Sequence, residues 1–212
     1  DVNTYSMVES PILTAAGLGL PLTSQPSFII DIGGGSTQIA AVSGDGIICG
    51  ISVNMGGLSI DAMISSKIEQ DFELKIGSLT AEKLKLAVGS LYRDDNLTTI
   101  VNGRDIYSGR PRAESVSSID IAAPVSAFFD KIFEITDMVM AKLPAEVSAD
   151  VRKTGVYFSG GVSMTAGLEE YFTSRTGMKA NVSDKGDVAA LLGGGVLASN
   201  PALLSKYRLN RR

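Results

Sequence analysis

The chemistry that this sequence could perform centres on three consecutive glycines between two apolar segments, in the run Asp31-Ile32-Gly33-Gly34-Gly35-Ser36-Thr37. Glycines lack a Cβ atom, so such a turn exposes backbone N–H groups that can wrap anionic oxygens. Ser36 and Thr37 would add hydroxyl donors, and Asp31 would hold a cation such as Mg²⁺, directly or through water. The run predicts a turn that binds phosphate. The alternative is a plain hairpin, although three glycines cost backbone entropy that an ordinary turn does not require.

Two further groups of residues have the types and spacing of a binding site. Gly160 and Gly161 follow a buried-type strand, where they would let a flat ligand approach the backbone. The alternative for this pair is an ordinary strand-to-helix turn. Glu82 and Lys85 lie three residues apart and share one face of a predicted helix. Taken alone, Glu82 and Lys85 are better explained as a solvated ion pair.

The elements that must position these residues mix strands and helices in an α/β pattern. Strands are predicted over residues 28–30, 38–42, 47–55, 97–101, 113–116, 156–158 and 178–182. Helices are predicted over residues 58–72, 80–91, 119–143, 167–175 and 188–198. We expect Thr80 to cap its helix, residues 102–105 to form a turn, and residues 201–212 to form a basic tail. The segment 74–118 is predicted to be a smaller second lobe.

The composition of the 212-residue chain excludes several classes of protein. The absence of histidine excludes His-dependent catalytic triads and His-ligated zinc. A net charge of −4 argues against a nucleic-acid partner. The single cysteine, Cys49, cannot form an internal disulfide, which indicates a reducing, intracellular compartment. The glycine run matches neither a P-loop nor a dinucleotide-binding fingerprint.

Several short motifs, in the same order and at matching spacing, resemble the C-terminal half of the MreB/Mbl proteins, the bacterial cell-shape branch of the actin-like ATPase superfamily. Residues 9–21 look like the family's "EEPMAAAIGAGLP", and residues 30–38 look like "VDIGGGTTE". Residues 80–90 look like "TAERIKHEIGSA". Matches to "IGGD", "VRGRNLAEGVP" and "PPELASDI…TGGG" lie at residues 55–57, 102–111 and 143–161.

This resemblance implies an RNase H-like sheet subdomain, shared with actin, hexokinase and chaperone ATPases, that carries a smaller inserted α+β lobe. The subdomain would comprise residues 1–73 and 119–212, and the lobe residues 74–118. ATP and Mg would bind in a cleft between two such halves, of which this chain resembles one. The implied ligand contacts are the second phosphate loop at Asp31, Gly33, Gly34, Gly35, Ser36 and Thr37, with Asp31 near Mg through water, the ribose at Glu82 and Lys85, and the adenine at Gly160, Gly161 and Val162.

The resemblance also implies a role in the cell. Such proteins polymerise into filaments that govern cell shape and wall synthesis. The implied partners are further copies of the protein and shape proteins such as RodZ, without nucleic acid. The protein would be cytoplasmic, at the inner face of the membrane, which it would contact only through the family's N-terminal half. Nothing in the sequence matches that half, and the chain starts at Asp1 rather than at a methionine, so we expect an excised domain that is inactive alone.

Two positions depart from the family pattern. Ser10 stands where the family has the glutamate that precedes proline and activates water, and Glu9 lies one residue earlier. A serine cannot act as a carboxylate base, so we expect hydrolysis to be weakened. Val162 stands where the family has a third glycine, and its branched side chain would narrow the base pocket. The alternatives are a scaffold that does not hydrolyse ATP, a sugar or acetate kinase-like phosphotransferase, an exopolyphosphatase, or a chaperone-type ATPase lobe.

Overall fold

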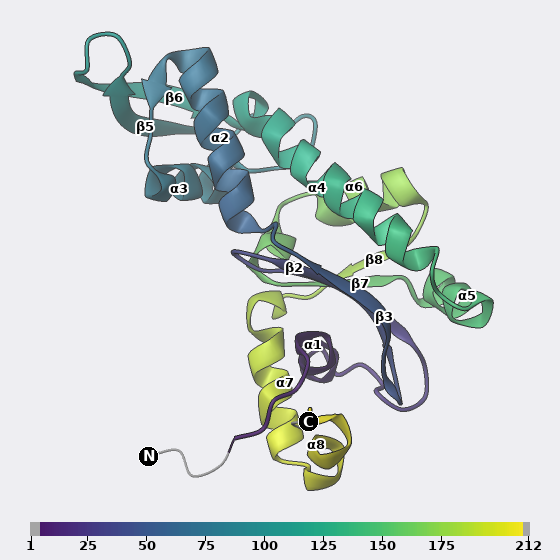
Figure 1. The fold of residues 1–212 in the computed structure, drawn as a ribbon. Coiled ribbons are helices and arrows are strands. Elements are labelled where there is room, and N and C mark those ends of the chain that lie inside the picture. Colours follow the sequence, from purple (N-terminus) through teal and green to yellow (C-terminus); the bar gives the residue numbers. More distant parts are fainter. Residues whose placement is uncertain (1–4, 210–212) are drawn as a thin grey trace.

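The structure is a computed structural model that describes residues 5–209. The larger part of the fold is built around a mixed five-stranded sheet (Figure 1). The strand order is β3-β2-β1-β7-β8. Strands β1, β2 and β3 form an antiparallel series, whereas β7 is parallel to β1 and β8 is parallel to β7. The strands are β1 (Ser27–Ile32), β2 (Thr37–Ser43), β3 (Gly46–Val53), β7 (Val156–Ser159) and β8 (Ala180–Val182).

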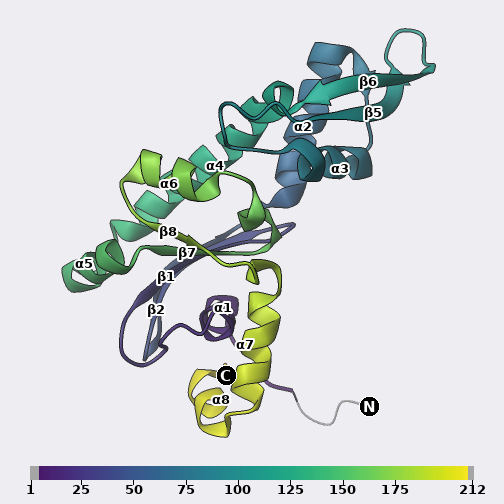
Figure 2. The same ribbon diagram turned by 180° about the vertical axis from the view of Figure 1, so that it is seen from behind.

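Both faces of this sheet are covered by helices, because β1 alternates between two cores. Its residues Phe28, Ile30 and Ile32 join the larger core, while Ile29 joins the smaller one. Helices α2 (Gly57–Phe72), α4 (Ser118–Met140), α5 (Ala145–Thr154) and α6 (Leu168–Thr176) contribute to the larger core. Helices α1 (Ser10–Gly17), α7 (Ala189–Ala198) and α8 (Pro201–Tyr207) contribute to the smaller core, on the opposite side of the sheet (Figure 2).

Helices α1 and α7 cross with their backbones in direct contact. A Cβ atom built on Gly17 would lie 1.8 Å from the Ala189 carbonyl oxygen, and one built on Gly193 would lie 1.8 Å from the Leu13 carbonyl oxygen. Side chains at either position would force the helices apart, since no packed Cβ tolerates such a distance. This contact fixes the position of α1, whose first turn lies beside β1.

A second, three-stranded sheet lies at one end of the molecule (Figure 1). Its order is β4-β5-β6, from β4 (Leu74–Lys75), β5 (Thr98–Asp105) and β6 (Pro111–Ser117), and α3 (Ser78–Val88) packs beside it. The buried side chains of these elements continue the larger core through α2 and α4. The boundaries 74–118 of a separate lobe therefore remain a prediction. Residues 1–4 and 210–212, at the ends of the predicted subdomain and basic tail, lie outside the described residues.

The structure corrects four sequence-based assignments. Helix α3 begins at Ser78 after Gly77, so Thr80 is not its cap. Residues 102–105 continue β5 rather than forming a turn, and the chain turns at residues 106–110 instead. The helix predicted to end at Leu143 ends at Met140, and α5 follows it. Part of the predicted tail is α8, whose first turn is capped by the Asn200 side chain.

Within the described residues, no single helix is long and apolar enough to cross a bilayer. One pair of helical segments, Gly186–Ala198 and Pro201–Tyr207, passes the same test by length and composition, but the two are bent by 116°.

Candidate functional site

The two glycine turns predicted from the sequence lie side by side at one end of the large sheet. The loop 33–36 follows the carboxyl end of β1, and Gly160 and Gly161 follow the carboxyl end of the parallel strand β7. Gly160 has φ 84°, and a Cβ atom there would lie 2.2 Å from the Ile32 carbonyl oxygen, so the two turns are in contact. Ligands of α/β sheets bind outside the carboxyl ends of parallel strands.

The loop after β1 is hydrogen-bonded to the start of α2 on one side and has open space on the other. The Gly33 N–H donates to the Ser36 carbonyl oxygen at 2.9 Å and closes the turn. The carbonyl oxygens of Gly33 and Gly34 accept from the first N–H groups of α2, at Gly57 (3.0 Å) and Leu58 (2.8 Å). Within residues 5–209, the N–H groups of Gly34 and Gly35 have no acceptor, and a Cβ atom on either residue would meet nothing within 4 Å. These donors are free to bind anionic oxygens.

The two hydroxyl residues of the loop differ in their surroundings. Thr37 is fully buried, and its Oγ1 donates to the Met55 carbonyl oxygen at 2.7 Å. Its hydroxyl therefore holds the loop against the segment that precedes α2. Ser36 is partly exposed at the end of the turn, where its side chain is the better placed of the two to meet a ligand.

Asp31 is a half-buried carboxylate without a cationic partner among the described residues. Its Oδ2 accepts a hydrogen bond from the Thr14 hydroxyl at 3.1 Å, and the Ser10 hydroxyl lies at 3.5 Å. Burial raises the pKa of Asp31 above its usual value, while the hydroxyls of Thr14, Ser10 and Ser159 oppose that rise. An unpaired carboxylate in such a position is costly unless a cation meets it. The surroundings of Asp31 therefore suit a hydrated divalent cation.

Lys85 does not pair with Glu82, so the interpretation of these two residues as a solvated ion pair is wrong. Its Nζ lies 2.8 Å from Oδ1 of Asp61, and the two side chains are 14% and 5% exposed. The same ammonium donates to the Gly57 carbonyl oxygen at 3.2 Å, directly behind the glycine loop. Glu82 is exposed on the outer face of α3. Lys85 thus joins α3 to the start of α2.

Asp61, the partner of Lys85, is a residue near the glycine loop that was not predicted from the sequence. It follows Ile60 on the buried side of α2, and a carboxylate in an apolar stripe requires a partner. That signal predicts a buried cation nearby, although it does not say which one.

Val162 lies in the turn after β7 with its side chain turned into the core. It is 8% exposed, and its Cγ2 would lie 3.2 Å from a Cβ atom built on Gly57. Its branched side chain therefore packs beside Lys85 and α2 rather than filling the space outside the turn. A ligand at Gly161 would meet exposed backbone, because a Cβ atom there contacts nothing within 4 Å.

Glu9 and Ser10 occupy the start of α1. Glu9 is the N-cap residue, and its exposed side chain makes no capping hydrogen bond. Ser10 is partly buried and faces Asp31. Both residues line a cavity of about 380 Å³ between α1 and the strands β2 and β3. The structure thus brings the predicted catalytic position close to the predicted cation ligand.

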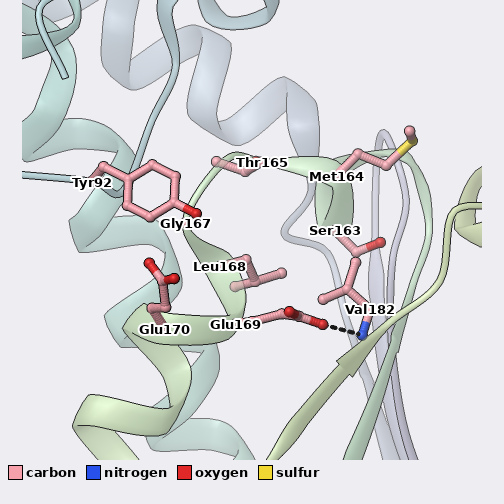
Figure 3. Close-up of a pocket in the computed structure, with 9 residues that line it drawn as sticks. All are labelled: Tyr92, Ser163, Met164, Thr165, Gly167, Leu168, Glu169, Glu170 and Val182. Atoms are coloured by element: carbon pink, nitrogen blue, oxygen red, sulfur yellow. Dashed lines mark hydrogen bonds between the residues drawn. The ribbon is translucent and has the colours of Figure 1, made fainter.

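A second cavity, of about 290 Å³, lies beyond the turn after β7 and contains none of the predicted site residues (Figure 3). Tyr92, Glu169 and Glu170 line it, and the Glu169 carboxylate accepts from the Val182 N–H at 3.1 Å. The negative charge of Glu170 is the main cause that raises the pKa of Tyr92. An acidic cavity of this kind disfavours phosphate, so the glycine turns remain the better candidate.

Comparison with known proteins identifies the fold class first. The structure matches MreB5 of Spiroplasma citri bound to AMPPNP with a TM-score of 0.88 and 26% identity, over 92% of this chain and 59% of that one. It matches a MamK double helical filament with a TM-score of 0.72 and 19% identity, over 91% and 59% of the two chains. The fold is therefore that of the actin-like ATPases, which confirms the fold class predicted from the sequence.

Comparison of the amino-acid sequence with known families and proteins then identifies the family of the chain. The MreB/Mbl protein family matches residues 2–206, and the cell shape-determining protein Mbl of Bacillus subtilis is 31% identical over 205 residues. This alignment covers 95% of the chain and 61% of the relative, so the chain spans about three fifths of the length of such proteins. The chain belongs to the MreB/Mbl family of cell shape-determining proteins.

Proposed function

We propose that this chain forms one side of an ATP-binding cleft in an MreB-like filament protein. The observation that carries the proposal is the juxtaposition of an unpaired carboxylate, Asp31, with the unused backbone donors of Gly34 and Gly35. The donors would bind phosphate oxygens, and Asp31 would hold Mg through water. A neighbour with the same fold at 26% identity binds AMPPNP, which supports the proposal.

The remaining predicted contacts would surround the nucleoside. Gly160, Gly161 and the backbone of Val162 would border the adenine, since this turn touches the glycine loop and exposes its backbone. Lys85 and the exposed Glu82 would lie on the ribose side, with Lys85 positioned by Asp61. We further propose that residues 74–118, which carry Glu82 and Lys85, move as a lobe relative to residues 5–73 and 119–209.

Bound ATP would supply the free energy that favours one arrangement of the two halves, because a ligand shifts the equilibrium toward the state that it binds better. In this proposal ATP holds the two halves closed around the cleft, and this closed state polymerises into filaments that govern cell shape and wall synthesis. The filament of the structural neighbour MamK and the shape-determining role of Mbl support this reading. The protein would act in the cytoplasm at the inner face of the membrane, with further copies of itself and shape proteins such as RodZ as partners.

Hydrolysis would be slow in this protein, since Ser10 cannot act as a carboxylate base and its hydroxyl faces Asp31. The same feature favours a second candidate function, a scaffold that binds ATP without turnover. In that case filaments would be controlled by nucleotide exchange alone.

The substitution Gly34→Val tests the site. A Cβ atom built on Gly34 meets no atom of the described residues within 4 Å, so the fold should keep its melting temperature while the valine side chain blocks the phosphate position. We expect calorimetric titration of the full-length gene product with Mg-ATP to show binding that Gly34→Val abolishes. The matched control is Gly195→Val, at a glycine of α7 that is also open to solvent and lies outside the site. Equal binding by both variants would refute the phosphate-loop assignment.

A further inference from the structure

A row of polar side chains crosses the large sheet at the level of the glycine loop. Asp31 of β1 is in register with Ser159 of β7 on one side and with Gln38 of β2 on the other, and Gln38 is in register with Ser52 of β3. Residues paired in register project to the same face of a sheet. All four therefore lie on the face that carries α1, where Ser10 and Thr14 approach Asp31.

The side chain of Gln38 differs from those of the other inner members of this row because no side chain or backbone group of the described residues hydrogen-bonds to it. The Ser159 hydroxyl donates to the Gly186 carbonyl oxygen at 2.9 Å, and Asp31 accepts from Thr14. Within residues 5–209 the Gln38 side-chain amide has no hydrogen-bond partner, although the residue is half-buried. The amide atoms of Gln38 are not among the fully buried side-chain atoms that lack a partner in the described residues, so its donor and acceptor remain accessible to a ligand.

The space that Gln38 faces is the cavity of about 380 Å³ at the start of α1. Gln38, Glu9 and Ser10 line it together with residues of β2 and β3. The cavity includes Ser10, the position where a carboxylate base would be expected, and the Ser10 hydroxyl lies 3.5 Å from the predicted cation ligand Asp31. Ser10 cannot supply that base, and Glu9 is exposed at the helix N-cap.

We propose that Gln38 orients the water molecule that attacks ATP, an inference that rests on the proposed nucleotide site. Its amide oxygen would accept a hydrogen bond from the water while its NH₂ group donates to an oxygen of the reacting phosphate, as a neutral side chain that positions water does. The water oxygen forms a bond to the γ-phosphorus, and the bond from that phosphorus to the β–γ bridging oxygen breaks. ADP leaves with the electron pair, one proton of the water passes to a phosphate oxygen, and the other remains on the inorganic phosphate formed.

The test compares two variants in the full-length gene product. Gln38→Met keeps the length of the side chain and removes the amide, whereas Gln38→Asn keeps the amide and shortens its reach. Gln70→Met, at an exposed glutamine of α2, is the matched control. Three quantities are measured for each protein: the affinity for Mg-ADP, the affinity for Mg-ADP with aluminium fluoride as a probe of the attacked phosphate, and the rate of phosphate release.

We expect both Gln38 variants to bind Mg-ADP with unchanged affinity. Phosphate release should fall about 100-fold, the scale typical of removing one preorganised hydrogen-bonding side chain from a transition state. The affinity gained on adding aluminium fluoride should fall with it, while Gln70→Met behaves as the unsubstituted protein.

The possible failures are distinct. If the unsubstituted protein does not bind Mg-ADP, the proposed function fails and this inference fails with it. If it binds but releases no phosphate, or if the variants retain full aluminium fluoride affinity, the nucleotide site stands and the role of Gln38 is refuted. Unfolding of both variants would also refute it, because the amide would then have a structural role.

Discussion

Replacing Asp61 by asparagine tests whether the ion pair with Lys85 holds α3 against the start of α2. The two charges are 2.8 Å apart, and the exposed fractions of their side chains are 5% and 14%. Removing one partner of a buried pair leaves the other charge uncompensated, which costs about 3 to 5 kcal/mol. We expect Asp61→Asn and Lys85→Met each to lower the free energy of unfolding by about 3 kcal/mol, since both groups keep slight contact with solvent.

The double variant Asp61→Leu, Lys85→Met separates the cost of an unpaired charge from the loss of packing. Replacing both members of a buried pair by apolar residues is often nearly neutral, so the double variant should recover most of the lost stability. Urea denaturation followed by circular dichroism measures all of these variants. The control is Asp71→Asn, which breaks the exposed pair with Lys67 (2.8 Å) and should cost about 0.5 kcal/mol or less.

Two results would contradict this account of Asp61 and Lys85. A loss below about 1 kcal/mol in both single variants would place the pair in the class of exposed ion pairs. If the double variant loses the sum of the losses that Asp61→Leu and Lys85→Met cause singly, the charges do not interact.

Two further predictions concern stability alone. Burial raises the pKa of Asp31 in the folded state, so the ionised carboxylate opposes folding without a cation, and the stability associated with its proton is lost as pH rises through the raised pKa. We expect Asp31→Asn to melt at a higher temperature than the unsubstituted protein at neutral pH without Mg. The difference in melting temperature should shrink toward pH 3, where Asp31 is protonated. A difference that does not change with pH would show that burial does not destabilise the ionised Asp31 carboxylate. Gly193→Ala should lower the free energy of unfolding by at least about 2 kcal/mol because its methyl group meets the Leu13 carbonyl, whereas Gly195→Ala, open to solvent, should gain up to about 1 kcal/mol. Equal urea midpoints for the two alanine variants would contradict the backbone contact between α1 and α7.

The local features of the fold were predictable because they depend on neighbouring residues. The apolar segments on either side of Gly33–Gly35 predict the β1–β2 hairpin, which the register from Ser27–Val42 to Ile32–Thr37 confirms. The motifs that resemble the MreB/Mbl family predict the fold and the family, and both are confirmed.

The features that were missed depend on contacts between distant segments. The Asn102-Gly103 pair indicates a turn locally, yet Gly103 lies in β5, where a Cβ atom would lie 2.7 Å from the Lys75 carbonyl oxygen of the adjacent strand. Glycine is required there for close approach of two strands rather than for a turn. Similarly, the partner of Lys85 lies 24 positions away on another helix, so spacing along α3 could not identify it.

Hydrogen exchange measured by mass spectrometry, with and without Mg-AMPPNP, tests most directly whether the glycine turns bind nucleotide. The free N–H groups of Gly34 and Gly35 should become protected on binding, so peptides that cover residues 31–37 and 160–164 should exchange more slowly. Protection confined to the acidic cavity around Tyr92 and Glu170, or no protection in the full-length gene product, would contradict the proposed site.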